Sequence, residues 1–367
     1  MRQIRLISSL MRMTNLFNLP IAQSGGITSS TNQPLKLSNP MNNDHQPLES
    51  HESSPSETAS TPQLIKHDWK RSFFSSRRNQ ILALGLLILA LGGFLLNETY
   101  RRAPSDQLVR IVSSVFPLPA VVVNGDAVSL SDYLAEYDAL MHSFETASAQ
   151  GTSLPAESDI QDAIVETIIN KTLLRQLAKE HGVSVSEEDV DAYYQDILIA
   201  QESEETFEAE LETTFGWTVE EFKERIVEPI VLLTAMTDYV LASGEIQSER
   251  LALMQSGYER LEAGEDFDYV ADEIHAQVDP SPEADLGYVK SSVIPEGWLA
   301  SVEALEVNDY TEIQSLYEGY AVFQVLDRIV AGEDTQMHLY AMTVPKKTLE
   351  EILVEYRDVS EIKNYLE

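Results

Sequence analysis

Cysteine is absent from this 367-residue chain. Without a thiol, the protein has no disulfide framework, no thiolate nucleophile and no cysteine-based zinc site. Histidine is sparse as well, and no pair of histidines has the spacing typical of a metal site. The sequence also lacks a phosphate-binding loop, a nucleophile elbow and a dinucleotide fingerprint. We therefore expect neither a metal nor a cofactor.

Positive charge is scarce, because 25 Lys and Arg face 60 Asp and Glu, for a net charge of −35. The imbalance is uneven: residues 1–97 carry nine basic and five acidic side chains, for a net charge of +4, whereas residues 98–367 carry 16 and 55, for −39. A region this acidic repels phosphate backbones and anionic lipid, so we expect no nucleic-acid partner. Basic or unfolded polypeptide is the partner that this charge favours. The oligomeric state is not readable from the sequence.

Long apolar runs are also missing, with one exception. Residues 79–97 contain no charged side chain, and Ile81 to Leu96 is almost wholly Leu, Ile, Ala, Gly and Phe. At roughly 1.5 Å per residue, such a helix reaches about 28 Å, which nearly matches a hydrocarbon core of about 30 Å. The run predicts a transmembrane helix through which the protein is anchored. Residues 1–78, rich in Ser, Asn, Gln, Pro and Thr, predict a disordered tail.

The orientation follows from basic residues on either side of this helix. The side preceding the helix holds more of them than the side following it, where Arg101 and Arg102 stand. The positive-inside rule therefore predicts a single-pass protein of the cell membrane with a cytoplasmic N-terminus and extracytoplasmic C-terminal domains. A cleaved signal peptide is the alternative, although a leading region of nearly 80 residues is long for one. Residues 98–120, with three prolines, predict a stalk.

Residues 121–245 predict a mainly helical unit. A short strand at Val121–Val123 runs into the turn formers Asn124 and Gly125. Amphipathic helices follow, with Ser129 or Ser131 capping the first and Ser186 capping another ahead of an acidic turn. Pro229 predicts a kink or a break in the last helix. The segments "VNGDAVSLSDYLAEYDAL", "IQDAIVETIINKTLLRQLAKEHGVSVSEEDVDAYYQDI" and "FEAELETTFGWTVEEFKERIVEPIVLLTAM" together resemble the N-terminal chaperone domain of the SurA/PrsA/PpiD family of extracytoplasmic folding factors.

Residues 246–332 carry a second resemblance. "ERLALMQSGYERLEAGEDFDYVADEI", "DPSPEADLGYV", "VIPEGWLASVEAL" and "EGYAVFQVLDRI" resemble, in order, the helices, loop and closing strand of a parvulin-type rotamase domain. The first strand of that family has no counterpart before Glu249. A strand at Met337–Val344, within the C-terminal segment 333–367, is a candidate substitute. We expect this segment either to complete the parvulin-like sheet or to pack on the helical unit.

The parvulin resemblance implies a site for prolyl isomerisation, but one that is degraded. Asp279 stands where the family has a Cys or Asp near the twisting carbonyl, and is the candidate catalytic residue. Val293 occupies the position of a methionine in the proline-binding cup, and Trp298 is the candidate cup aromatic; both are the predicted substrate-binding residues. Ala321 and Ala341 fall where the family has its two histidines. His338, three residues from Ala341, is expected on the opposite face of its strand.

These observations predict an α+β protein with a transmembrane helix, an all-α chaperone-like domain and a parvulin-like sheet with helices. The favoured hypothesis is a membrane-anchored chaperone that binds unfolded or proline-containing exported polypeptides and has weak or absent peptidyl-prolyl isomerase activity. An active isomerase and a structural envelope tether are the alternatives. Client binding would use exposed aromatic side chains of the helical unit, if they are exposed: Tyr133, Tyr137, Tyr193, Tyr194, Trp217 and Phe222.

Overall fold

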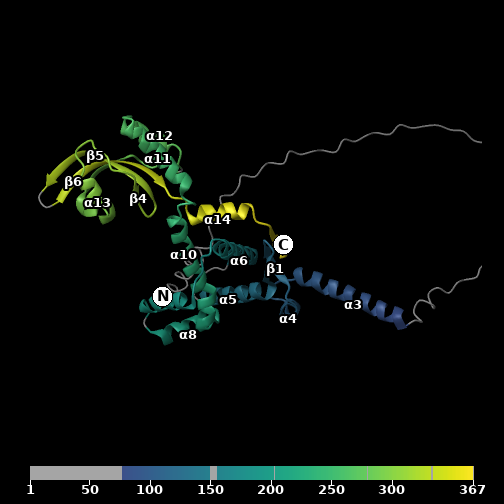
Figure 1. Ribbon diagram of the computed structural model, residues 1–367. Helices are drawn as coiled ribbons and strands as arrows, with labels where there is room; N and C mark the ends of the chain where they lie inside the picture. The colour runs from purple at the N-terminus through teal and green to yellow at the C-terminus, as the bar shows by residue number, and fades with distance from the viewer. Residues whose placement is uncertain (1–76, 149–154, 202, 279, 332–333, 367) are drawn as a thin grey trace, which may run out of the picture. The chain divides into compact units, whose positions relative to one another are not determined.

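The computed structural model describes residues 77–148, 155–201, 203–278, 280–331 and 334–366. They divide into two units, residues 77–102 and 103–366, and each is described by itself. The first unit is helix α3 (Arg77–Tyr100), drawn in blue in Figure 1. By length and composition its stretch Gln80–Tyr100 is long and apolar enough to cross a membrane, and none of its apolar window is buried.

The second unit begins with a helix inside the predicted stalk. Helix α4 (Gln107–Val115) starts at Asp106, whose carboxylate accepts a hydrogen bond from the Leu108 backbone N–H at 2.8 Å. On α4, Val109 is buried and Arg110 forms two hydrogen bonds with Asp138 of the next helix, α5, at 2.5 and 2.6 Å. The prolines suggested an extended linker, but the apolar spacing between them is sufficient to form a helix that packs on α5.

The helical body consists of a β-hairpin and a series of helices. Its strands are β1 (Pro119–Val123) and β2 (Asp126–Ser129), and its helices are α5 (Leu130–Ser148), α6 (Glu157–Glu180), α7 (Glu187–Ile199), α8 (Glu204–Phe215), α9 (Val219–Phe222) and α10 (Glu228–Ala242). The hairpin turns at Asn124 and Gly125, which both have positive φ, as the sequence indicated. Ser129 caps α5 through the Asp132 N–H, and Ser186 forms a capping box with Asp189 on α7.

The helix does not stop at Pro229: α9, a π-helical turn over Lys223–Val227 and α10 follow one another with helical backbone throughout, and Pro229 is the second residue of α10. Proline has no N–H for the carbonyl four residues earlier, which is that of Arg225. The Lys171 ammonium donates to this carbonyl at 2.9 Å instead. Burial lowers the pKa of Lys171. The disruption predicted at Pro229 is thus a local π-helical turn. The Arg225 carbonyl, which proline leaves without a backbone donor, is satisfied by Lys171 from α6.

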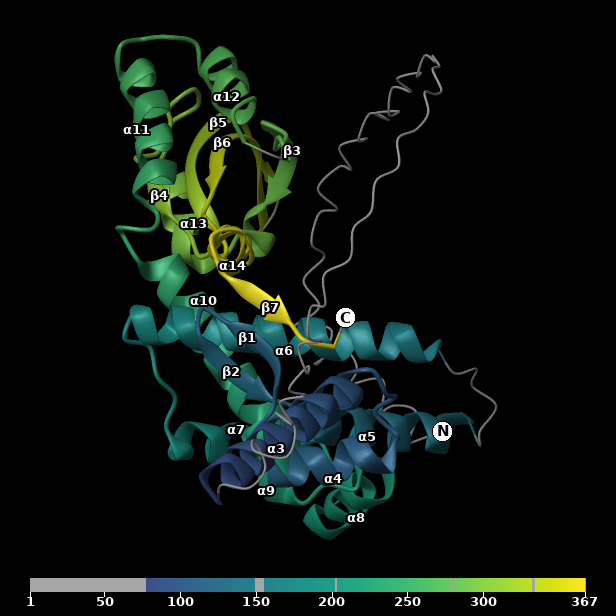
Figure 2. The ribbon, with the colours of Figure 1, turned by 90° about the vertical axis from the view of Figure 1, so that its right-hand side faces the viewer.

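The sheet body follows the helical body in sequence. Its elements are α11 (Ser248–Glu262), α12 (Phe267–His275), β3 (Asp285–Lys290), a 3-10 turn (Ser291–Val293), α13 (Glu296–Glu303), β4 (Gln314–Ser315), β5 (Gly319–Ala331) and β6 (Asp334–Pro345). The strands form an antiparallel sheet in the order β3-β6-β5-β4 (Figure 2). The strand expected at Met337–Val344 is therefore a central strand of this sheet.

Each face of the sheet has its own apolar core. Helices α11 and α12 cover one face, where Met254 and Ile274 pack with Val322 and Met342. Gly257 packs closely there: a Cβ at this position would lie 2.7 Å from the Met342 Sδ and 2.9 Å from the Ile274 Cγ1, so a larger residue would force these side chains to shift. Helix α13 covers the other face with a separate core.

The chain then returns to the helical body. Helix α14 (Leu349–Asp358) contacts α6 and α10, and β7 (Ile362–Asn364) pairs antiparallel with β1. The small sheet has the order β2-β1-β7, and Figure 2 shows the C-terminal segment in yellow running to it. The sheet body is thus inserted between α10 and α14, and the C-terminal segment both supplies the central strand β6 and packs on the helical body. The α+β class predicted from sequence is confirmed.

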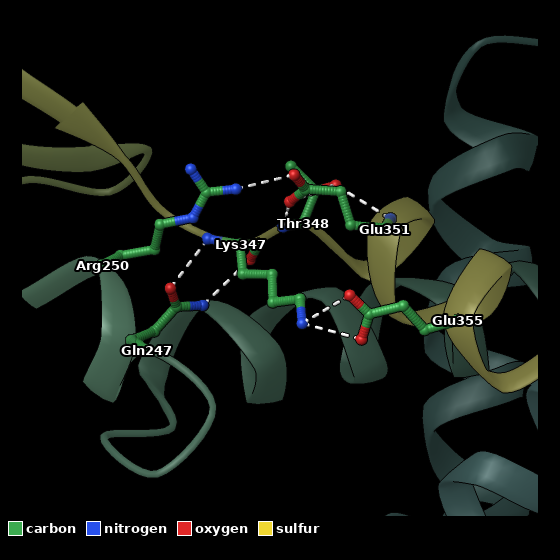
Figure 3. A network of polar contacts seen from close by, with 6 residues as sticks. All are labelled: Gln247, Arg250, Lys347, Thr348, Glu351 and Glu355. Atoms are coloured by element: carbon green, nitrogen blue, oxygen red, sulfur yellow. Dashed lines mark hydrogen bonds and ion pairs between the residues drawn. The ribbon is translucent and has the colours of Figure 1, made fainter. Parts of the chain in front are cut away.

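The two chain crossings between the bodies meet at Gln247, which is 1% exposed. Its amide nitrogen donates to the carbonyls of Val240 and Lys347, both at 2.9 Å, and its amide oxygen accepts from the Lys347 N–H at 2.8 Å. Ion pairs Arg250–Glu351 and Lys347–Glu355 lie beside it (Figure 3). This Gln247 junction ties the entry and exit of the inserted body together.

Candidate functional site

Three of the positions implied for a rotamase site, Ala321, Ala341 and Trp298, lie on the α13 face of the sheet. Ala321 on β5 and Ala341 on β6 are 0% and 1% exposed, and Phe323, two residues after Ala321, pairs directly with Ala341. Trp298 of α13 stacks on Phe323, with ring centroids 4.1 Å apart and an interplanar angle of 4°. Apolar side chains therefore occupy the place where the resemblance would put histidines and a cup for proline.

The other implied residues are not part of this packing. Val293 ends the 3-10 turn and is 67% exposed. Asp279, the candidate catalytic residue, lies outside the described residues. Trp298 itself is half-buried against the α13-side core. Of the predicted substrate-binding pair, Trp298 is thus half-buried against the core and Val293 lies on the surface.

His338 lies on the opposite face of the sheet from Ala341. Its Nε2 is 2.7 Å from the Asp285 Oδ1, and its ring lies against that of Tyr288, with centroids 5.0 Å apart. The pKa of Asp285 is lowered by hydrogen bonds from the Gly287 N–H and from His338. His338 therefore belongs to a surface polar cluster and has no access to the predicted rotamase site.

The aromatic residues considered for client binding are mainly core residues of the helical body. Tyr133, Tyr137, Tyr194 and Phe222 are each less than 5% exposed. Tyr194, Phe222 and Phe207 form an aromatic cluster with centroids 5.4 to 6.4 Å apart. The remaining two candidates, Tyr193 and Trp217, are half-buried.

A cleft with a volume of about 560 Å³ lies in the helical body, between α6, α14 and β7. Its lining combines apolar and charged side chains: Asp162, Val165, Glu166, Ile169, Arg357, Ile362 and Asn364. The four from α6 follow the spacing i, i+3, i+4 and i+7, so they share one face of that helix. A concave site with an apolar floor and a few polar groups is the usual form of a binding site.

Arg357 organises the polar wall of this cleft. Its Nη2 donates to the Glu166 Oε1 at 3.0 Å, its Nη1 lies 2.8 Å from the Glu166 Oε2, and Nη1 also donates to the Asn170 Oδ1 at 3.0 Å. This forked arrangement fixes the end of α14 against α6. Asp162 is exposed, and no interaction neutralises its charge among the contacts of the described residues. The cleft therefore offers an acidic group beside a buried apolar floor of Val165 and Ile169.

Sequence reasoning did not find this cleft. The apolar stripe of α6 that faces the core of the body runs through Ile160, Ile164 and Ile168. Val165 and Ile169 lie one residue further along and extend the apolar surface toward α14. The helical spacing was a usable signal, but the other wall comes from residues almost 200 positions away.

Residues 74–215 match the family described as SurA-like N-terminal domain. The match spans α3 to α8, begins upstream of the predicted boundary at residue 121, and supports the SurA/PrsA-type family expected from the sequence. No curated protein matches the chain. The resemblance of residues 246–332 to a parvulin domain stays a prediction.

Proposed function

We propose that this protein is a membrane-anchored extracytoplasmic chaperone that binds unfolded exported polypeptides and has weak or absent peptidyl-prolyl isomerase activity. The observation that carries the proposal is the match of residues 74–215 to a SurA-like N-terminal domain, a domain of a periplasmic chaperone family. Helix α3 supplies an anchor of sufficient length and apolarity. The predicted orientation places residues 103–366 outside the cytoplasm.

The cleft of the helical body is the proposed client site. Val165 and Ile169 close its floor with only 7% and 3% of their surface exposed, half-buried Ile362 offers the accessible apolar contact, and Asp162 adds negative charge at the rim. Segments of unfolded chain that carry apolar side chains next to Lys or Arg fit this lining. The acidic character of residues 98–367 also attracts basic segments and repels acidic ones at a distance.

Low isomerase activity is proposed because the implied rotamase site is packed with apolar side chains. The parvulin resemblance implies a cup that admits proline and polar groups near the twisting carbonyl. Ala321 and Ala341 offer no polar side chain, and the stacked pair Trp298–Phe323 occupies the face.

The test uses the full chain reconstituted in lipid nanodiscs. We expect the parent to suppress aggregation of a chemically unfolded client at near-stoichiometric ratios, and Asp162→Lys to suppress it less. Asp196→Lys is the matched control, because it makes the same charge change on an exposed site of α7 outside the cleft. Absence of suppression by the parent would contradict the chaperone function; equal loss in both variants would contradict the cleft as its site.

Isomerase activity is measured separately, by NMR exchange on a short Xaa-Pro peptide with the parent and Asp279→Ala. We expect no acceleration by either protein. Acceleration by the parent that is lost in Asp279→Ala would identify an active isomerase with an unusual site.

A further inference from the structure

Helix α4 carries apolar side chains that its packing on α5 leaves uncovered. Val109 and Ser113 are 2% and 7% exposed, whereas Ile111 and Val115 are 57% and 67% exposed. Phe116, directly after the helix, is 55% exposed. Surface positions of a water-exposed helix are normally polar. The apolar part of α4 is thus wider than the contact with α5 requires.

The uncovered residues form one stripe. Ile111 and Val115 are four residues apart, so they lie one above the other on the same side of the helix. Val109 and Ser113 repeat the same spacing on another side, the buried one. The side of α4 that carries Ile111 and Val115 can therefore contact an apolar environment while the side that carries Val109 and Ser113 stays packed on α5.

The position of α4 in the chain limits what can cover this stripe. The apolar span ends at Tyr100 and α4 begins at Gln107, so residues 101–106 alone connect them. Six residues reach at most about 20 Å when fully extended. If α3 crosses the membrane, α4 is held within that distance of the membrane surface, whatever the orientation of the rest of the protein.

The charges near α4 do not oppose contact with a lipid surface. Arg101 and Arg102 are exposed and directly follow the span, and Arg102 pairs with Glu98 at 3.6 Å. Arg110 is paired with Asp138. Lipid contact is therefore supported by the apolar stripe and by its short tether to the span, which together are the pattern of a helix that lies in the lipid headgroup region.

We propose that Ile111, Val115 and Phe116 dock into the lipid interface beside the point where α3 leaves the membrane; this rests on the proposed membrane anchor. Because α4 is packed on α5 by Val109 and by the Arg110–Asp138 pair, the contact also holds the helical body close to the membrane. Residues 98–120 then act as a docking element and not as a flexible stalk.

The experiment takes advantage of the absence of cysteine, because a single introduced cysteine is the only site that a thiol-reactive fluorophore labels. The full chain is reconstituted in vesicles of phosphatidylcholine and phosphatidylglycerol that contain nitroxide-labelled lipids. Labels are placed at Ile111→Cys and Val115→Cys. Ile199→Cys is the matched control, an apolar residue 83% exposed at the end of α7, and Leu89→Cys reports the span.

We expect lipid nitroxides to quench the labels at Ile111 and Val115 at least ~2-fold more than the label at Ile199. Quenching at Leu89 with equal, weak quenching at Ile111 and Ile199 would overturn the docking of α4 and leave the anchor intact. No quenching at Leu89 would overturn both. A blue-shifted emission at Ile111 without lipid quenching would show that protein covers the stripe, and would also overturn the proposal.

Discussion

The helical body and the sheet body of residues 103–366 differ in how their candidate binding surfaces are packed. The helical body keeps an open cleft in which Arg357 and Glu166 stand beside an apolar floor. The sheet body closes the implied rotamase face with the Trp298–Phe323 stack and with alanines at 0% and 1% exposure. Both faces of the sheet are covered by apolar cores, and the positions that the parvulin resemblance assigns to histidines hold buried alanines. The two bodies therefore differ in what their packing leaves accessible: a lined cleft in one and a filled sheet face in the other.

The largest effect should come from reopening the packed face. Phe323→Ala removes a ring that is 3% exposed and the stacking partner of Trp298. We expect the free energy of unfolding of the sheet body to fall by about 3–5 kcal/mol. The variant loses the transfer free energy of the buried ring, and the cavity left behind destabilises it further. Urea unfolding followed by tryptophan fluorescence measures it. Val293→Ala, at a 67% exposed position, serves as the control and should change stability by less than about 0.5 kcal/mol.

A loss below about 1 kcal/mol for Phe323→Ala would mean that this face is loosely packed. The contrast with the open cleft would then fail, and isomerase activity should be measured again on the variant.

The junction between the bodies should be the next most sensitive place. Gln247→Ala removes three hydrogen bonds and leaves the Lys347 N–H and two carbonyls unsatisfied next to a site that is 1% exposed. We expect about 2–3 kcal/mol of destabilisation. Hydrogen exchange should then show faster exchange at Lys347 and along α14. Unchanged exchange there would mean that the ion pairs Arg250–Glu351 and Lys347–Glu355 suffice to hold the crossings.

The cleft should tolerate change better than the packed face. Arg357→Met keeps the apolar part of the side chain and removes its bonds to Glu166 and Asn170. Because the Arg357 side chain is 21% exposed, we expect a loss of only about 1–2 kcal/mol. Thermal unfolding measures stability, and the client aggregation assay measures function. A loss as large as that of Phe323→Ala would remove the distinction between an adjustable cleft and a rigid core.

The smallest expected effect is a dependence of the free energy of unfolding on pH, caused by His275 of α12. His275 is 2% exposed, and its Nε2 accepts a hydrogen bond from the Thr343 N–H at 2.9 Å, so the folded protein holds it neutral. Burial lowers the pKa of His275 below its usual 6.5. The unfolded chain therefore binds the proton more readily, and the stabilisation present above pH 6.5 is lost as the pH falls toward the folded-state pKa.

The measurement compares urea unfolding of the parent and of His275→Gln at pH 7.5 and at mildly acidic pH. Glutamine can accept the same N–H bond without titrating. We expect the parent to lose more stability than the variant between the two pH values. Equal losses would assign the acid sensitivity to titratable groups other than His275.

Local signals in the sequence predicted local structure well. The Asn124-Gly125 turn and the Ser186 cap depend on neighbours within a few residues. The strand at Met337–Val344 was also recognisable, because its alternating side chains face two different cores. Such features are determined by short-range sterics and periodicity, which a sequence displays directly.

Features that depend on distant partners were not predictable in the same way. β7 has three residues and no periodicity of its own, and it forms only because β1 offers an edge about 240 positions earlier. The cleft likewise forms only when α14 and β7 pack against α6. Helix α4 was missed for another reason: three prolines dominated the interpretation of residues 98–120, although none lies inside Gln107–Val115.

The pairing of β1 with β7 also means that the helical body can be completed only after the inserted sheet body has been synthesised. During synthesis, every strand of the inserted sheet has emerged by Pro345, whereas the helical body waits for Ile362–Asn364. Once the sheet body has folded, the Gln247 junction holds about 100 residues in a compact unit. The loop between β1 and β7 is then shorter by that length, and the free-energy cost of closing it is about 0.5 kcal/mol lower. The middle of the chain can therefore mature first, and its folding brings the two ends of the helical body together.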